Sequence, residues 1–181
     1  MTVLVTGAAG FIGFHTSRAL LQRGDKVIGI DNLNDYYDVS LKQARLDVLG
    51  AHEGFRFECL DIADKAAVGD LIKGHGGITR VVHLASQAGV RYSMVDPYAY
   101  THANVEGQLV LLETCRTLER LDHFVYASSS SVYGGNTKLP FSIQDPVDRP
   151  LSIYPAPKRS MHPMPPSHAH SKPIPLTGRS F

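Results

Sequence analysis

The sequence of 181 residues has few cysteines, almost no net charge and no long apolar run. Two cysteines, Cys59 and Cys115, are too few to staple a scaffold with disulfides, and they indicate a reducing compartment. The formal charge of +1, from 18 basic and 17 acidic residues, argues against a dedicated nucleic-acid or membrane-surface binder. No run reaches the roughly 18 apolar residues that a membrane span needs. The apolar start lacks the basic leader of a signal peptide. We expect a cytoplasmic protein without nucleic-acid or membrane partners.

Prolines and acidic residues are distributed unevenly along the chain. Ten of the 11 prolines lie between Pro140 and Pro175, and no acidic residue follows Asp148. The first 148 residues carry 13 basic and 17 acidic side chains, a formal charge of −4, whereas the remainder carries five positive charges. Each proline removes a backbone donor. We therefore expect a folded domain over residues 1–154 and an irregular, proline-rich tail over residues 155–181.

Short apolar runs alternate with helical periodicities through the first domain. The patterns predict strands over 3–5, 26–30, 55–60, 80–84 and 123–127, and helices over 11–23, 40–49, 64–73 and 97–118. Ser40 is expected to cap the second helix, and Gly24 to end the first. Strand and helix in strict alternation predict a parallel sheet with right-handed crossovers. The fold class is α/β, a doubly wound, Rossmann-like sheet.

A glycine-rich turn follows the first expected strand and opens the first helix. Gly7, Gly10 and Gly13 would allow a sharp turn, close approach of a diphosphate, and tight packing of helix on strand, respectively. Asp31 ends the second strand 18 residues beyond Gly13, where a carboxylate binds ribose hydroxyls and repels a 2′-phosphate. This pattern predicts NAD rather than NADP. The alternative is that the glycines only punctuate a turn and Asp31 is a solvated charge.

Two further features lie at the carboxyl ends of the expected strands, and each can be interpreted in two ways. Asp61 ends the third strand, so that its side chain or the amide of Ile62 could meet the adenine, but Asp61 is also suited to cap the helix near Asp64. Tyr36 and Tyr37 would pack over the adenine side or belong to a plain surface loop.

A run of four serines, Ser128 to Ser131, leaves the fifth strand on the same edge, and Tyr154 and Lys158 lie four residues apart. A tyrosine has an ordinary pKa near 10. A neighbouring ammonium favours the phenolate and makes the tyrosine a usable base. A serine hydroxyl orients the substrate oxygen for proton transfer. The alternative is that Tyr154 and Lys158 form an ordinary surface pair, but the nucleotide turn upstream and the serines at the end of the fifth strand favour the proton-transfer role.

These residues resemble a known family. The strings GAAGFIG (7–13), HLASQAGVRYS (83–93) and YASSSSVYGG (126–135), with Tyr154 and Lys158, are similar to the extended short-chain dehydrogenase/reductases. DNLNDYYD (31–38) and SSSSVYGGNTKLPF (128–141) resemble the epimerases of that family that act on UDP-glucuronate. The resemblance is dense over about residues 1–154 and scattered beyond them.

The resemblance implies an NAD-dependent isomerase that converts UDP-glucuronate to UDP-galacturonate through transient oxidation to a 4-keto sugar. Two sister reactions on nucleotide sugars, 4,6-dehydration and decarboxylation, are alternatives. Dehydratases carry an acidic pair beside the serine, which the four serines here lack. A further alternative is a non-catalytic NAD-binding module.

The resemblance also implies roles for individual residues. Ser129, Tyr154 and Lys158 would be catalytic, with Ser129 chosen from its 25-residue separation from Tyr154, and Ser130 and Ser131 as the next choices. Arg91, Ser129 and Ser130 would bind the sugar nucleotide; for Arg91 a solvated loop position is the alternative. Asn104 would lie behind the catalytic lysine. The cofactor would contact Gly7, Gly10, Phe11, Ile12, Gly13, Asp31, Asn32, Asp61, Ile62, Leu84, Ala85, Asn104, Tyr154 and Lys158.

Partners and metals complete the expectations. Family members pair through the helices that contain Asn104 and Tyr154, so a homodimer is possible. His162, His168 and His170 lie on a proline-rich segment without an accompanying cysteine or carboxylate, and we expect no metal site.

The tail departs from the family pattern. The resemblance implies a second domain that binds the substrate, and we expect this sequence to stop before that domain. The expected helix around Tyr154 reads YPAPKRSMHPMPPSHAH. We expect the tail to be a truncated or corrupted remnant of the catalytic helix. NAD binding depends on residues 1–135 and would then be retained, whereas turnover would be impaired.

Overall fold

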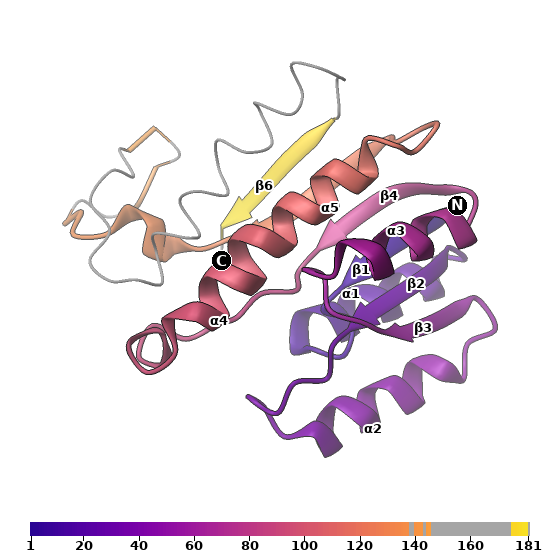
Figure 1. The fold of residues 1–181 in the computed structure, drawn as a ribbon, viewed down its shortest axis with the longest axis horizontal. Coiled ribbons are helices and arrows are strands. Elements are labelled where there is room, and N and C mark those ends of the chain that lie inside the picture. Colours follow the sequence, from indigo (N-terminus) through magenta and orange to yellow (C-terminus); the bar gives the residue numbers. More distant parts are fainter. Residues whose placement is uncertain (138–139, 143, 146–174, 181) are drawn as a thin grey trace.

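A six-stranded parallel sheet organises the chain in the computed structural model, which describes residues 1–137, 140–142, 144–145 and 175–180 (Figure 1). The strands lie in the order β3-β2-β1-β4-β5-β6, and every pair is parallel. The order reverses between β1 and β4, which confirms the doubly wound α/β fold. The strands are β1 (Thr2–Thr6), β2 (Lys26–Asp31), β3 (Phe55–Cys59), β4 (Ile78–His83), β5 (His123–Ser128) and β6 (Leu176–Ser180).

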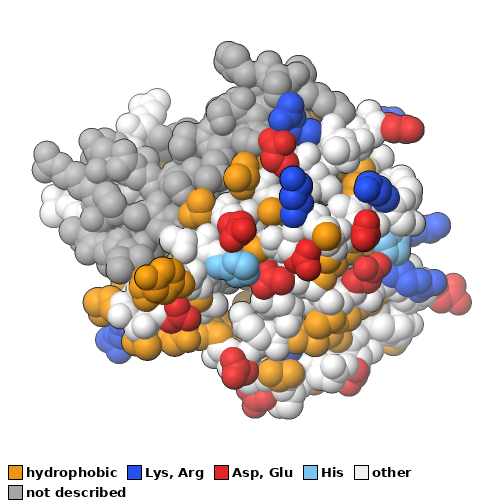
Figure 2. Space-filling view, viewed as in Figure 1, with side chains coloured by type: hydrophobic (Ala, Val, Ile, Leu, Met, Phe, Trp, Pro, Cys, Tyr) orange, Lys and Arg blue, Asp and Glu red, His pale blue; other side chains and the backbone are white. Residues whose placement is uncertain are grey.

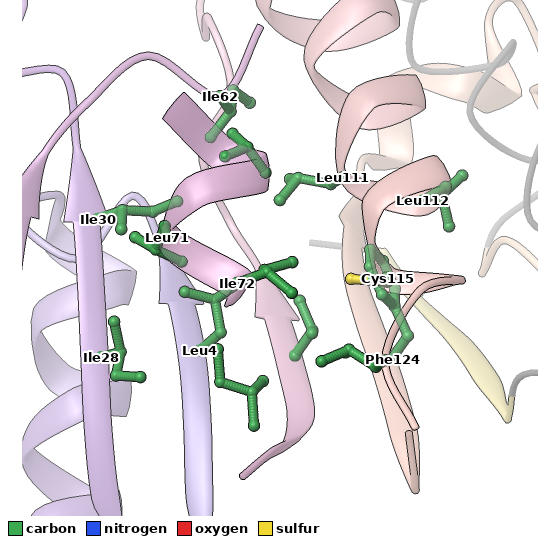
Figure 3. Close-up of a cluster of buried hydrophobic side chains, with 14 of the residues drawn as sticks. Leu4, Ile28, Ile30, Ile62, Leu71, Ile72, Leu111, Leu112, Cys115 and Phe124 are labelled. Carbon is green, nitrogen blue, oxygen red and sulfur yellow. The ribbon is translucent and has the colours of Figure 1, made fainter. Parts of the chain in front are cut away.

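Helices cover both faces of the sheet because successive side chains of each strand point to opposite sides. Leu4 of β1 packs in a cluster with residues of α3 (Lys65–Gly74) and α5 (Gly107–Cys115). Val3 and Val5 pack in a second cluster with residues of α1 (Phe11–Gln22) and α2 (Val39–Gly50). Figure 3 shows the first cluster, in which Leu71 and Ile72 of α3 lie near Ile30 and Leu4 of the strands, and Leu111 of α5 points toward them.

The expected helix over 97–118 forms, but it is not regular. Asp96 caps its start by accepting the Ala99 amide at 3.2 Å, and Pro97 occupies the first turn. The helix runs as α4 (Pro97–Thr101), a π-helical turn over His102–Glu106, and α5. π-Helical turns occur often at functional sites, and this one carries Asn104. Cys115 is buried at its end, and burial raises the pKa of its thiol to about 12.

The cap of α2 differs from the prediction. Asp38, not Ser40, is the cap residue, and its carboxylate accepts the Ser40 amide at 2.8 Å and the Ser40 hydroxyl at 2.7 Å. These hydrogen bonds, the one from the hydroxyl above all, lower the pKa of Asp38. A carboxylate accepts both donors, whereas Ser40 offers one oxygen. α3 begins as expected, with Asp64 accepting the amides of Ala66 and Ala67.

The prediction that residues 155–181 are irregular is wrong for residues 176–180. Leu176–Ser180 forms β6, paired with β5 in parallel register, and Thr177 bonds His123 at 2.8 Å. Gly178 lies opposite Tyr126, and a side chain there would approach the tyrosine ring to 2.8 Å. A five-residue edge strand containing a glycine has no clear alternation, which is why the sequence did not reveal it. Residues 155–174 lie outside the described part of the chain.

The surface carries both signs of charge. On the face shown in Figure 2, acidic and basic side chains are interspersed, and hydrophobic side chains gather at the lower left, where Figure 1 places α4. Exposed hydrophobic residues at this end of the molecule include Met94, Val95 and Tyr98. Among the described residues, no helix is long and apolar enough to cross a membrane.

The cap of α3 gives a stability test. Asp64→Ala removes the acceptor of two amides and should lower the free energy of unfolding by about 1 kcal/mol. Asp70→Ala is the matched control, because Asp70 is an exposed carboxylate within the same helix. Urea denaturation measures both. Equal stability of the two variants would contradict the assigned cap.

Candidate cofactor and active site

The turn between β1 and α1 is built so that only glycine fits at two of its positions. Gly7 has φ +70°, and a Cβ there would lie 2.8 Å from the amide nitrogen of Ala85. A Cβ on Gly13 would overlap the carbonyl oxygen of Gly7. Gly10 donates its amide to that same carbonyl at 3.0 Å and is the first residue before α1. The backbone of α1 therefore begins in direct contact with the end of β1.

The start of α1 offers backbone donors to an anion. No side chain caps this helix, and its first turn holds no acidic residue. The amides of the first helical turn have no partners within the helix, and the helix dipole adds positive potential there. Phe11 and Ile12, the first two residues of α1, are 66% and 42% exposed. This end of the helix is thus an open site for a phosphate or diphosphate.

A cleft runs from this turn along the carboxyl edge of the sheet. Its lining comes from the turn after β1 and from the segments that follow β2, β3 and β4, together with single residues of α2 and of the π-helical turn. The lining residues are Gly7, Gly10, Asp31, Asn32, Asn34, Tyr36, Tyr37, Lys42, Leu60, Asp61, Ile62, Leu84, Ala85, Ser86, Gln87 and Ala103. Most cofactor residues expected from the sequence are thereby brought together.

Asp31 is buried at the end of β2, with 8% of its surface exposed. One of its oxygens accepts the Leu33 amide at 2.9 Å and lies 3.4 Å from the ammonium of Lys42. Lys42 is itself 5% exposed and donates to the side-chain oxygen of Asn34 at 3.1 Å. The alternative in which Asp31 is a solvated charge is therefore wrong.

Sequence reasoning missed Lys42 as part of the site. A signal was present, because Lys42, Leu46 and Leu49 are spaced four and three residues apart and form the buried side of α2. A lysine on the buried side of a helix needs a partner, and the partner is Asp31. Arg45, one turn further on, donates to the carbonyl of Ala9 at 3.1 Å, so α2 also holds the glycine-rich turn.

Asp61 belongs to the cleft and does not cap α3. One of its oxygens accepts the Ala63 amide at 2.8 Å, and the other accepts the side-chain amide of Asn32 at 3.1 Å. His102 lies 3.5 Å from the latter oxygen. Ile62 is buried, and it packs so closely on Gly107 that a Cβ there would overlap its side chain. The ends of β2 and β3 are therefore joined across the cleft floor.

Thr6 holds the segment after β4 in place. Its hydroxyl oxygen accepts the amides of Leu84 at 3.1 Å and Ala85 at 3.0 Å. Since both lone pairs are used, the hydroxyl proton goes to Nδ1 of His83, 2.8 Å away. His83 is buried at the end of β4 and packs next to Phe124.

Asn104 fastens the next part of this segment. Its side-chain oxygen accepts the Ser86 hydroxyl and the Gln87 amide, each at 2.8 Å, and its nitrogen donates to the Gln87 carbonyl at 3.0 Å. Asn104 is fully buried in the π-helical turn. Within the described residues it positions the lining of the cleft. Its expected place behind Lys158 concerns a residue outside the described part.

The serine run ends β5 at the same edge. Ser129 begins a 3-10 helix over Ser130–Tyr133, and its hydroxyl oxygen accepts the hydroxyl of Ser131 at 2.9 Å. Ser130 is exposed. Arg91 is exposed at the start of a 3-10 helix over Tyr92–Met94. Tyr154 and Lys158, with which these residues are expected to act, lie outside the described residues, as do His162, His168 and His170. No group of three His, Cys, Asp or Glu suited to a metal ion occurs among the described residues.

Several known proteins are similar to this chain in sequence and in fold. An uncharacterised 37.6 kDa protein of Escherichia coli O111:H- is 51% identical over the whole of this chain and 53% of its own length. UDP-glucuronate 4-epimerase 4 of Arabidopsis thaliana is 49% identical over the whole chain and 41% of its own length. The crystal structure of UDP-glucuronic acid 4-epimerase from Bacillus cereus, in complex with UDP-glucuronic acid and NAD, matches with a TM-score of 0.88 at 34% identity, covering 98% of this chain and 55% of that one.

The chain spans about half the length of the curated relatives that it matches. The similarity does not stop at Tyr154, because a family match extends over residues 3–177 and includes most of the proline-rich segment. That match, together with the fold and the glycine-rich turn, shows that the chain belongs to the NAD dependent epimerase/dehydratase family.

Proposed function

We propose that this chain binds NAD along the cleft and takes part in the inversion of C4 of a nucleotide sugar, converting UDP-glucuronate to UDP-galacturonate. The observation that carries the proposal is the turn at Gly7 and Gly13, where the backbone leaves no room for a side chain beside an uncapped helix start. A cleft lined by Asp31 and the segments after three other strands extends from this turn. Its shape and donor set suit a dinucleotide.

The residues would divide the cofactor between them. The amides at Phe11, Ile12 and Gly13 would bind the diphosphate, and Asp31 the adenosine ribose, with Asn32 beside it. Asp61 and Ile62 would meet the adenine, whereas Leu84 and Ala85 would lie along the rest of the cofactor. When bound, NAD would supply the redox chemistry. The chain would supply position, and Thr6 and Asn104 hold the residues that do so.

Proton transfer would fall to Ser129, Tyr154 and Lys158. Ser129 would orient the sugar 4-hydroxyl, and Tyr154, with Lys158 beside it, would take the proton. Ser129 is supported by its place at the start of the 3-10 helix, where its hydroxyl already accepts the hydroxyl of Ser131. The planar guanidinium of Arg91 suits the sugar carboxylate.

Support for UDP-glucuronate comes from the names of the similar proteins, which include UDP-glucuronate 4-epimerases of a plant and a bacterium. The test is direct. Calorimetry measures NAD binding by the 181-residue protein, and incubation with NAD and UDP-glucuronate is followed by chromatography for UDP-galacturonate. A 4,6-dehydrated or decarboxylated product would replace epimerisation by a sister reaction. Binding without any product would favour a non-catalytic NAD module.

The glycine-rich turn gives a binding prediction. Gly13→Ala should abolish measurable NAD binding, because the added Cβ overlaps the Gly7 carbonyl and displaces the start of α1. Gly69→Ala is the matched control, since a Cβ at this helical position has no neighbour within 4 Å and should leave binding unchanged. Calorimetry compares the two proteins, and circular dichroism verifies their folding. Unchanged binding by Gly13→Ala would refute the assigned diphosphate site.

Asp31 gives a prediction about cofactor choice. Asp31→Asn should weaken NAD binding by roughly tenfold, because a charge-assisted hydrogen bond to the ribose is lost. Its affinity for NADP should rise relative to NAD, since the repulsion of a 2′-phosphate disappears while Lys42 remains. Asp35→Asn, a change of an exposed carboxylate in the same loop, is the control. An unchanged ratio of the two dissociation constants would contradict the role of Asp31.

The serine run gives a prediction about turnover. Ser129→Ala should lower kcat by roughly 100-fold while leaving NAD affinity unchanged, because the substrate oxygen loses its orienting donor. Ser130→Ala should lower kcat less, since its side chain would contribute to binding the sugar nucleotide. Initial rates of UDP-galacturonate formation decide between them. The reverse order would move the catalytic assignment from Ser129 to Ser130.

A further inference from the structure

The two sides of the cofactor cleft meet through Tyr36. This residue follows β2, together with Asn32, Asn34 and Tyr37, all of which line the cleft. The ring of Tyr36 nevertheless contacts the ring of Tyr92, which follows β4, with the two centroids 4.9 Å apart. Tyr37 packs edge-on against Tyr36 at 4.7 Å. The segment Asn32–Tyr37, which we call the strap, therefore reaches from one side of the cleft to the other.

The far end of the strap rests on Gly89. Gly89 has φ +96°, and a Cβ on it would overlap the hydroxyl of Tyr36. The backbone around Gly89 is held by hydrogen bonds. The hydroxyl of the buried Tyr100 donates to the carbonyls of Ala88, at 2.8 Å, and Gly89, at 2.5 Å. Tyr100 belongs to α4, so α4 holds the backbone that Tyr36 contacts.

The near end of the strap is anchored as firmly. Leu33 donates its amide to Asp31, and Asn34 accepts a hydrogen bond from Lys42, which is paired with Asp31. The two side chains that anchor the strap here, Asp31 and Lys42, are both buried. Between its anchors the strap lines the cleft, which Leu84 to Gln87 also line. A segment that lines the cleft and is held at both ends is suited to cover a long ligand, and loosening one end would ease the ligand's exit.

We propose that the strap closes over the bound dinucleotide and that the contact of Tyr36 with Gly89 and Tyr92 slows its release. This inference rests on the proposed NAD site. It agrees with the chemistry of an epimerisation, in which substrate and product have the same oxidation state. The cofactor is restored at the end of each turnover and has no need to leave.

The test measures release of a fluorescent cofactor. The 181-residue protein is loaded with NADH and mixed rapidly with excess NAD, and the loss of bound nicotinamide fluorescence gives the release rate. Tyr36→Ala should release NADH on the order of tenfold faster, as expected from the loss of one aromatic contact. Association should quicken as well, so that the dissociation constant changes less than the release rate. Tyr98→Ala, which removes a tyrosine that is 82% exposed, should release NADH like the wild type.

A second variant reaches the same contact from its other side. Gly89→Ala changes none of the residues that line the cleft, but the added Cβ displaces Tyr36, and it should speed release about as much as Tyr36→Ala. The double variant should release NADH no faster than either single variant, because all three variants lose the same contact between Tyr36 and Gly89. Wild-type release rates in Tyr36→Ala, or equally fast release in Tyr98→Ala, would overturn the strap. Failure of the wild type to bind NADH at all would instead overturn the NAD site on which it rests.

Discussion

The cleft depends on the contact between the carbonyl of Gly7 and the start of α1 at Gly13. There, and where the backbone of Leu84 and Ala85 crosses Gly7, main chain meets main chain without room for a Cβ. This close approach brings an uncapped helix start to the edge of the sheet, where the ends of the parallel strands also lie. Thr6, the last residue of β1, uses its single hydroxyl to hold the neighbouring strand end at the same point. Any side chain added at Gly7 or Gly13 would separate parts that the site needs in contact.

Around this centre, buried polar side chains position backbone segments. Asn104 satisfies both its oxygen and its nitrogen on Ser86 and Gln87. Lys42 and Asp31 neutralise one another at the end of β2, and Lys42 also holds Asn34. A buried hydrogen bond left half made costs more than the bond contributes when complete, so each of these groups defines one arrangement of its loop. The loops that line the cleft are thereby fixed without regular secondary structure of their own.

The same reasoning explains why α2 is more than packing. Its buried side combines Leu46 and Leu49, which pack in the second hydrophobic cluster, with Lys42, which reaches Asp31 at the end of β2. Arg45 extends from the same helix to the Ala9 carbonyl in the glycine-rich turn. α2 therefore connects the hydrophobic core, the end of β2 and the turn before α1. A shift of α2 would move the cleft lining at both of these places.

The amino-acid sequence alone determined the alternation of strands and helices, the glycine-rich turn and the acid at the end of β2, because each of these is encoded by spacing within about thirty residues. It did not reveal β6, whose five residues form a strand only by pairing with β5. The tertiary structure also decided the partners of Lys42, the hydrogen bonds of Thr6 and the approach of Tyr36 to Gly89. Thr6 and His83 are 77 residues apart, and nothing in either local pattern specifies the other. Parallel strands bring such residues together at one edge of the sheet, and contacts of this range arise only when the sheet has formed.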